Sequence, residues 1–276
     1  MNKATTVAGA LAQAKALGLD RLDAQLLLAH VLARPRPWLF AHDDAQLDAA
    51  QHGAFHTLTA RRVAGEPVAY LVGEKAFHGL VLQVDANVLV PRPDTELLVD
   101  WAIELLPHAD TPQRVVDLGT GSGAIALAVK QARPDASVVA TDISEAALAV
   151  ARANAARLGL DVAMQHSAWW RGLEGRRFDL VLSNPPYIAG ADPHLAALQH
   201  EPTLALTPGG DGLDALREII AGARDHLAPG GWLLLEHGYD QADAVQALLR
   251  AQGFAAIETR HDLGGQPRCT GGRIDP

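Results

Sequence analysis

The residues best suited to chemistry are Asn184, Pro185, Pro186 and Tyr187, which directly follow the apolar run Phe178–Ser183. Each proline has a fixed φ and restricts the residue before it, so this loop is stiff. It would present two acceptors, the Asn184 side-chain carbonyl and the Pro185 main-chain carbonyl, which match the two N–H donors of an –NH2 group. Tyr187 adds a flat face for stacking a planar amide or base. An ordinary turn is the structural alternative for an Asn-Pro loop.

Such a pair of acceptors suits transfer of a methyl group to nitrogen. The nitrogen of a carboxamide or an exocyclic amino group is a weak nucleophile, because its lone pair is delocalised into the adjacent π system. Acceptors that hold both N–H groups aim the lone pair, and they strengthen as positive charge grows on the nitrogen. The sequence therefore predicts an N-methyltransferase site with Asn184 and Pro185 as its catalytic pair.

A second motif is the glycine-rich loop between a predicted strand, Arg114–Leu118, and a predicted helix, Ala124–Ala132. Glycine allows sharp turns and close approach to a ligand, and the helix N-terminus offers free amides. The loop also fits a dinucleotide fingerprint, so a nicotinamide cofactor stays open. Asp142 lies 23 positions after Gly119 and can accept hydrogen bonds from the ribose of either cofactor, with helix capping as its structural alternative.

The elements that must position these residues alternate between strand and helix, which predicts an α/β fold with a mostly parallel sheet covered on both faces. The predicted strands are Arg114–Leu118, Ser137–Thr141, Val162–Gln165, Phe178–Ser183, Trp232–Leu235, Ala255–Arg260 and Arg268–Ile274. The predicted helices between them are Ala124–Ala132, Ser144–Leu158, Leu213–Leu227 and Gln241–Ala251.

The first seventy residues have helical periodicity, with Asp20 as an N-cap and a later helix over about Asp44–Ala64. Phe77–Val84 and Val88–Val90 flank a turn composition and predict a β-hairpin. We therefore expect a small helical domain at 1–72, a β-hairpin linker at 73–92 and a larger domain at 93–276.

Three segments together carry a family resemblance: Asn184–Tyr187, the loop Asp117–Gly123, and Val88–Glu96. They resemble the peptide chain release factor glutamine N5-methyltransferases, the PrmC/HemK family. The likeness covers the chain from about residue 20 and extends through Arg61-Arg62, Gly65–Leu71, Glu201-Pro202 and Leu234–Gly238. Asn-Pro-Pro-Tyr alone is shared with adenine N6-methyltransferases.

This resemblance implies a Rossmann-like methyltransferase domain that uses S-adenosylmethionine to methylate the glutamine of the Gly-Gly-Gln loop in release factors. The implied cofactor contacts are Gly119, Thr120, Gly121, Ser122, Gly123, Asp142, Trp169 and Asn184; the implied glutamine contacts are Asn184, Pro185, Pro186 and Tyr187. Ala168 stands where the family commonly has a carboxylate or amide, so adenine would be held by stacking and main-chain amides. The helical domain would dock the substrate, although a bundle that only adds stability has the same pattern.

Two expectations, for Trp169 and for the segment Pro91–Glu96, have structural alternatives. Trp169 is assigned to the adenine, although Trp169 and Trp170 are equally suited to anchoring a loop. The segment Pro91–Glu96 is expected to line the mouth of the site, and a linker is its structural alternative.

The composition of the chain excludes some classes of binding partner. The 276 residues include 23 Lys plus Arg and 32 Asp plus Glu, a net charge of −9 that argues against nucleic acid as the main partner. The lone Cys269 and the lack of a signal or spanning segment predict a cytoplasmic protein without a membrane partner, expected as a monomer. His52 and His56 have metal-ligand spacing, but Gly53 replaces the glutamate of a zinc protease, so no metal site is expected.

Four other functions stay open. They are methylation of a ribosomal-protein glutamine, adenine N6-methylation of DNA or RNA, nicotinamide-dependent oxidoreduction, and cofactor binding without catalysis.

Overall fold

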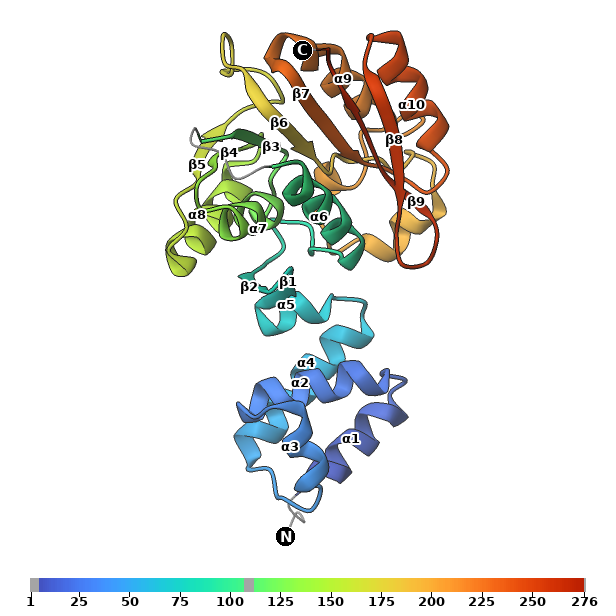
Figure 1. Cartoon of the computed structure of the whole chain (residues 1–276). Coiled ribbons are helices and arrows are strands. Elements are labelled where there is room, and N and C mark those ends of the chain that lie inside the picture. Colours follow the sequence, from blue (N-terminus) through green and yellow to red (C-terminus); the bar gives the residue numbers. More distant parts are fainter. Residues whose placement is uncertain (1–4, 107–111, 276) are drawn as a thin grey trace. The chain divides into compact units, whose positions relative to one another are not determined.

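The structure is a computed structural model that describes residues 5–106 and 112–275. The chain divides after Glu74 into two units, Met1–Glu74 and Lys75–Pro276 (Figure 1).

The first unit is helical and has its own core, in which Leu27, Leu28 and Phe55 are buried. Its helices are α1 (Val7–Ala16), α2 (Arg21–Leu32), α3 (Arg36–Ala41), α4 (Ala49–Val63) and α5 (Val68–Val72). The predicted cap is confirmed, because the Asp20 side chain accepts a hydrogen bond from the Leu22 amide at 2.7 Å.

The predicted helix over Asp44–Ala64 begins later than expected. Asp48 accepts from the Gln51 amide while the Gln51 side chain accepts from the Asp48 amide, and this capping box starts α4 at Ala49. Gln46 instead forms an isolated β-bridge with Thr6.

The second unit contains, within the described residues, a seven-stranded sheet in the order β5-β4-β3-β6-β7-β9-β8. Its strands are β3 (Arg114–Leu118), β4 (Ser137–Asp142), β5 (Ala163–His166), β6 (Phe178–Ser183), β7 (Leu227–Glu236), β8 (Ala255–His261) and β9 (Pro267–Arg273). The first five are parallel, and β9 runs antiparallel between β7 and β8. The expected α/β architecture is confirmed, and the strand order reverses beside β3.

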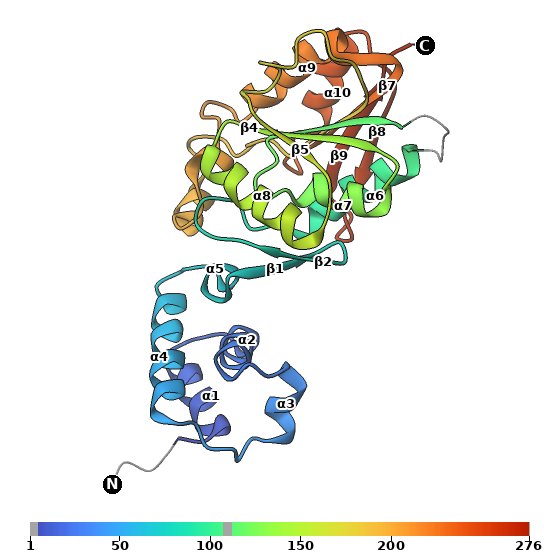
Figure 2. The same ribbon diagram turned by 90° about the vertical axis from the view of Figure 1, so that its left-hand side faces the viewer.

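Helices cover both faces of this sheet (Figures 1 and 2). On one face lie α6 (Glu96–Leu105), α7 (Ala124–Ala132) and α8 (Glu145–Leu158), and on the other lie α9 (Asp214–His226) and α10 (Ala242–Ala251).

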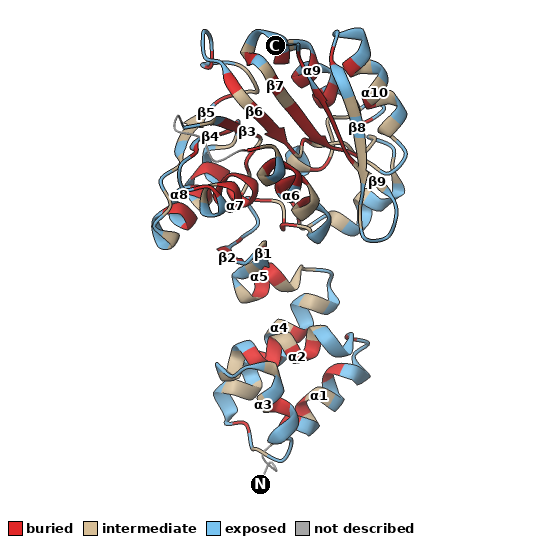
Figure 3. Cartoon of the chain, viewed as in Figure 1, coloured by how far each residue is buried: buried red, intermediate tan, exposed pale blue. Residues whose placement is uncertain are grey.

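Side chains from one strand alternate between the two cores. Val115 packs in the core with α6 and α7, whereas Val116 packs in the core with α9 and α10. Figure 3 shows this burial along the strands and on the inward sides of the helices. Because both faces are covered, the strands are continuous apolar runs.

The predicted hairpin is wrong in position. The strands are β1 (Glu74–Phe77) and β2 (Leu80–Gln83), joined by His78 and Gly79, which both have positive φ, +45° and +77°. Glycine adopts that conformation readily, so the tight turn forms there. Val88–Val90 forms no strand, and the Val90 amide donates instead to Glu201 Oε2 at 3.1 Å.

Two further differences concern the larger unit. The sequence analysis does not predict α6, whose inward residues Leu98, Val99, Trp101 and Ala102 are buried. β7 begins at Leu227, five residues before the predicted start. Short 3-10 turns occur at Pro93–Thr95 (η1), Pro193–Leu198 (η2) and Thr203–Ala205 (η3).

Candidate active site

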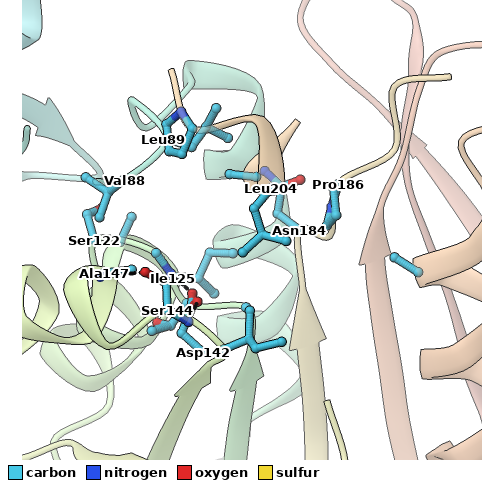
Figure 4. Close-up of a pocket in the computed structure, with 18 of the residues that line it drawn as sticks. Val88, Leu89, Ser122, Ile125, Asp142, Ser144, Ala147, Asn184, Pro186 and Leu204 are labelled. Atoms are coloured by element: carbon cyan, nitrogen blue, oxygen red, sulfur yellow. Dashed lines mark hydrogen bonds between the residues drawn. The ribbon is translucent and has the colours of Figure 1, made fainter. Parts of the chain in front are cut away.

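A pocket of about 380 Å³ opens at the carboxyl ends of β3, β4 and β6. This is where doubly wound sheets bind ligands, and its size suits a small molecule. In Figure 4, Asn184 and Pro186 lie on one side and Val88 and Leu89 lie across from them, with Asp142 at the strand ends. The predicted site residues that line it are Gly119, Thr120, Gly121, Ser122, Asp142, Trp169, Asn184 and Pro186.

The glycine loop joins β3 to α7 in a backbone path that needs glycine. Gly119 has a φ of +74°, and a Cβ there would lie 3.3 Å from the Trp169 ring. Gly123 has a φ of +85° and caps α7; a Cβ there would lie 2.9 Å from Leu127 Cδ1. Gly123 does not line the pocket, so its visible role is to let α7 pack closely.

Thr120 lines the pocket, and its hydroxyl donates to Asp117 Oδ2 at 2.6 Å. Asp117 is fully buried, and burial raises its pKa to about 7 while the Thr120 hydroxyl opposes that rise. The Thr120 side chain is therefore held by a carboxyl group beneath the loop.

Asp142 ends β4 beside this loop and is only 9% exposed. Its Oδ2 accepts from the Gly121 amide and its Oδ1 from the Ser144 amide, both at 2.9 Å. Burial raises the pKa of Asp142, and these amides lower it again. Ser144 caps α8 by accepting from the Ala147 amide at 3.1 Å, as predicted. The Ile143 amide acts on the same carboxylate, so three amides leave at least one of its roughly four acceptor sites for a further donor.

The two neighbouring tryptophans have different places. Trp169 lines the pocket, with a φ of +51° that is uncommon for a non-glycine residue. Trp170 points away as an anchor: its Nε1 donates to the Ile219 carbonyl at 3.1 Å, and its ring stacks on His226 at 4.5 Å. The positions thus separate a pocket residue from a loop anchor.

The loop after β6 offers the predicted acceptors. Asn184 Nδ2 donates to Thr95 Oγ1 at 3.2 Å. Within the described residues, no hydrogen bond engages Asn184 Oδ1 or the Pro185 carbonyl. Asn184 and Pro186 line the pocket, whereas Pro185 is buried and is not part of its wall.

Tyr187 is not brought to the pocket wall. Its hydroxyl donates to Glu236 Oε1 at 3.2 Å, and its carbonyl accepts from Gln241 Nε2 at 3.0 Å. Burial and the neighbouring Glu236 carboxylate raise the pKa of Tyr187. The stacking role of Tyr187 stays a prediction.

Sequence analysis places Thr95 only within the segment expected at the mouth of the site and gives Glu236 no role. In the structure Thr95 contacts Asn184, and Glu236 contacts Tyr187. Glu236 is 1% exposed, and burial raises its pKa to about 7, opposed by the Thr95 and Tyr187 hydroxyls and by the charge of Arg268. An acidic residue that ends the buried run Trp232–Leu235 is the signal that points to it in the sequence.

One wall of the pocket is held by Glu201, which is buried. Its carboxylate accepts from the Val90 amide and from the Arg92 guanidinium. Pro91, Arg92 and Thr95 line the pocket, which confirms the expectation that part of Pro91–Glu96 borders the site.

No helix in the described ranges is long and apolar enough to cross a membrane. His52 and His56 lie on α4; the described residues contain no group of three or more potential metal-ligating side chains.

The comparisons with known proteins agree with this architecture. Residues 95–253 match the Methyltransferase small domain family, and residues 5–73 match the PrmC N-terminal domain. A methyltransferase from Pyrococcus furiosus with 19% identity superposes with a TM-score of 0.56 over 80% of this chain and 99% of its own, which supports the fold. The chain is a methyltransferase.

Its more similar relatives define the family. A release factor glutamine methyltransferase from Xylella fastidiosa (strain Temecula1) is 51% identical over 92% of this chain and 94% of its own. One from Bordetella pertussis is 51% identical over 93% of this chain and 96% of its own. The chain belongs to the release factor glutamine methyltransferase family, as the resemblance implied.

Proposed function

We propose that this enzyme transfers a methyl group from S-adenosylmethionine to the side-chain amide N5 of the glutamine in the Gly-Gly-Gln loop of peptide chain release factors. The observation that carries the proposal is the pair of unengaged acceptors after β6, Asn184 Oδ1 and the Pro185 carbonyl, next to the pocket of the glycine loop. The names of its relatives point to the same acceptor protein.

The residues around the pocket fit the cofactor. Gly119–Ser122 would hold its methionine part, Asp142 its ribose and Trp169 its adenine. Asp142 fits because its carboxylate lines the pocket and keeps at least one acceptor site, and Trp169 fits because its ring already lies over Gly119. Gly123 supports this loop from behind. S-adenosylmethionine, when bound, supplies an electrophilic methyl group on a sulfonium.

The acceptors would prepare the glutamine nitrogen. A primary amide has two N–H donors, so Asn184 Oδ1 and the Pro185 carbonyl can each hold one. Pro186 keeps Pro185 extended, and fixed orientation contributes several kcal/mol to such reactions. The methyl C–S bond of the sulfonium would break as the C–N bond forms, which leaves neutral S-adenosylhomocysteine and moves the positive charge to the nitrogen. Both acceptors would stabilise that charge until one N–H proton leaves to water.

The test is label transfer from S-adenosyl-[methyl-3H]methionine. We expect label in a release factor and none in a matched release factor whose Gly-Gly-Gln glutamine is replaced by alanine. Ribosomal protein and DNA are assayed in parallel. Label in either of them but not in the release factor would overturn the proposal, and tight NADH binding without cofactor-dependent methylation would favour an oxidoreductase.

We also propose that the helical domain, residues 1–72, docks the release factor, that 73–92 link it to the catalytic domain at 93–276, and that the enzyme works as a cytoplasmic monomer without nucleic acid. The match of residues 5–73 to the PrmC N-terminal domain supports the first part. Light scattering would test the monomer, and titration with RNA oligonucleotides would test the absence of nucleic acid.

A further inference from the structure

Trp169 has a backbone conformation that tryptophan seldom adopts. Its φ of +51° lies in the left-handed region, where the Cβ of an L-residue is crowded. A residue keeps such a conformation only where its surroundings hold it there. The Trp169 ring lies beside the glycine loop, 3.3 Å from the position of a Cβ on Gly119. The contacts that hold Trp169 therefore also hold one wall of the pocket.

One set of contacts holds the main chain around Trp169. The Ser167 hydroxyl donates to the Trp169 carbonyl at 3.0 Å and also lies against the Arg171 carbonyl. The Ser167 amide donates to the Asp142 carbonyl at 2.9 Å, which ties this segment to the end of β4. Such contacts fix the backbone path, but the places of the two neighbouring indoles depend on what each ring packs against.

The indole of Trp170 is seated on α9. Its Nε1 donates to the Ile219 carbonyl at 3.1 Å, and its ring stacks on His226 with 4.5 Å between the centroids and 17° between the planes. Gly222 lies between these two residues on the same face of the helix. A Cβ on Gly222 would lie 2.3 Å from Trp170 Cδ1 and 2.5 Å from Trp170 Nε1, closer than real Cβ atoms approach. The indole thus fills a notch that exists only because residue 222 has no side chain.

This notch explains a glycine that the helix itself does not favour. Gly222 lies inside α9, where glycine lowers helix stability relative to alanine, and its φ is not positive, so alanine would suit the backbone. The helix is a firm support, because its Ile219, Ile220 and Ala223 are buried. The lack of a side chain at position 222 therefore serves the packing of Trp170.

We propose that Gly222 and Trp170 are positioning residues for cofactor binding. The Gly222 notch seats the Trp170 indole on α9, and this anchor keeps the adjacent Trp169 in its left-handed conformation with its ring at the pocket wall. A ring that is already in place need not be ordered when the ligand binds, so the anchor raises the affinity for the adenine. The inference deepens the proposed function and rests on the assignment of Trp169 to the adenine.

Gly222→Ala is the direct test, because the new Cβ would displace the Trp170 indole. The dissociation constant of S-adenosylhomocysteine, measured by calorimetric titration without acceptor protein, should rise about fivefold to tenfold. The kcat at saturating cofactor should stay within about twofold. A loss of folded protein would instead lower kcat and leave the dissociation constant unchanged, so this split separates positioning from a purely structural role.

Two further variants calibrate this result. Trp169→Ala removes the stacking surface itself and should raise the dissociation constant about tenfold to a hundredfold. The matched control is Gly53→Ala, at an exposed glycine inside α4 with open space at its Cβ position. It should raise Tm slightly and leave the dissociation constant unchanged. A wild-type dissociation constant in Gly222→Ala would overturn the inference.

A double-mutant cycle tests whether Gly222 acts through Trp170. Trp170→Ala should raise the dissociation constant about as much as Gly222→Ala does. Adding Gly222→Ala to Trp170→Ala should then cost nothing further, because the indole that the notch receives is gone. A full additional loss in the double variant would contradict the role of the notch.

Trp170→Phe covers the case in which Gly222→Ala fails to fold, since it keeps a ring in the notch and removes the Nε1 donor to Ile219. The chain has five tryptophans, so protein labelled with 5-fluorotryptophan gives few 19F signals, and that of Trp169 is assigned by its loss in Trp169→Phe. This signal should shift in Gly222→Ala and in Trp170→Phe but not in Gly53→Ala. No shift in either Gly222→Ala or Trp170→Phe would reject the positioning role.

The inference and the proposed function can fail separately, because the binding and 19F measurements contain no acceptor protein. The expected changes in an enzyme inactive on release factors would reject only the proposed acceptor. An unchanged dissociation constant in Trp169→Ala would reject the adenine assignment and this inference together, while label in a release factor would still support the proposed acceptor.

Discussion

The glycine loop and the Asn184 loop line the same pocket, but different kinds of structure hold them. Residues 119–123 follow their path through backbone conformation and close packing, as at Gly123 against Leu127. Asn184 depends on a hydroxyl 89 positions earlier in the chain. The first region is held by glycine conformations and by main-chain amides that donate to Thr141 and Asp142, whereas the second is held by a side-chain hydroxyl from another element.

The largest effect expected from this difference is on catalysis. Asn184→Ala removes an acceptor at the reacting centre and should lower the single-turnover rate about a hundredfold or more, with cofactor affinity preserved. Single-turnover methylation and calorimetric titration with S-adenosylhomocysteine measure the two quantities. Near-normal turnover would remove Asn184 from the mechanism.

Substitutions in the glycine loop should instead lower the free energy of unfolding. Gly123→Ala forces an alanine to a φ of +85° with its Cβ 2.9 Å from Leu127 Cδ1. We expect it to lose about 1–3 kcal/mol of unfolding free energy more than Gly121→Ala, because Gly121 has a positive φ but no atom within 4 Å of its Cβ position. Urea denaturation measures both variants, and equal losses would mean that close packing at Gly123 is unimportant.

Asp142 lies on the cofactor side of the pocket, so its replacement should weaken cofactor binding more than it lowers kcat. Asp142→Ala should weaken S-adenosylhomocysteine binding about tenfold, roughly 1.4 kcal/mol, while kcat at saturating cofactor changes less. Asp161→Ala, at an exposed carboxylate before β5, is the control. An unchanged dissociation constant in Asp142→Ala would count against the ribose assignment.

The last effect is on stability alone and concerns Glu236, the buried acid that accepts from Tyr187. Burial raises the pKa of Glu236 from 4.5 to about 7, so between these pH values the folded state keeps a proton that the unfolded state has lost. The contribution of Glu236 to the unfolding free energy is therefore fully present below pH 4.5 and is lost as the pH rises to about 7.

Glu236→Gln should remove that decline, so the unfolding free energy of the variant should change about 2 kcal/mol less between pH 5 and pH 7 than that of the wild type. Asp117 titrates in the same direction in both proteins and cancels from the difference. Unfolding in urea across this pH range measures the effect, and parallel curves for the two proteins would show that Glu236 ionises normally.

The contrast between local patterns and contacts made only in the fold also explains which features the sequence could predict. The strands Arg114–Leu118 and Phe178–Ser183 and the Ser144 cap agree with the structure, because apolar runs and capping residues act locally. The hairpin was misplaced because the apolar residues Val88–Val90 resemble a strand, whereas in the fold the Val90 amide pairs with Glu201. The contacts of Thr95 with Asn184 and of Glu236 with Tyr187 could not be predicted, since 89 and 49 positions separate the partners, which meet only after the sheet has formed.

The place of β9 has a consequence for the order of assembly during synthesis. β9 lies between β7 and β8, although the ribosome makes it after both. Until β9 is available, the leucine-rich edge of β7 has no antiparallel partner and is open to wrong pairing. Glu236 pairs in register with Cys269 of β9. The contacts of Asn184 with Thr95 and of Tyr187 with Glu236 join segments that the ribosome makes before β9, so this edge of β7 stays uncovered after the site's own parts have been synthesised.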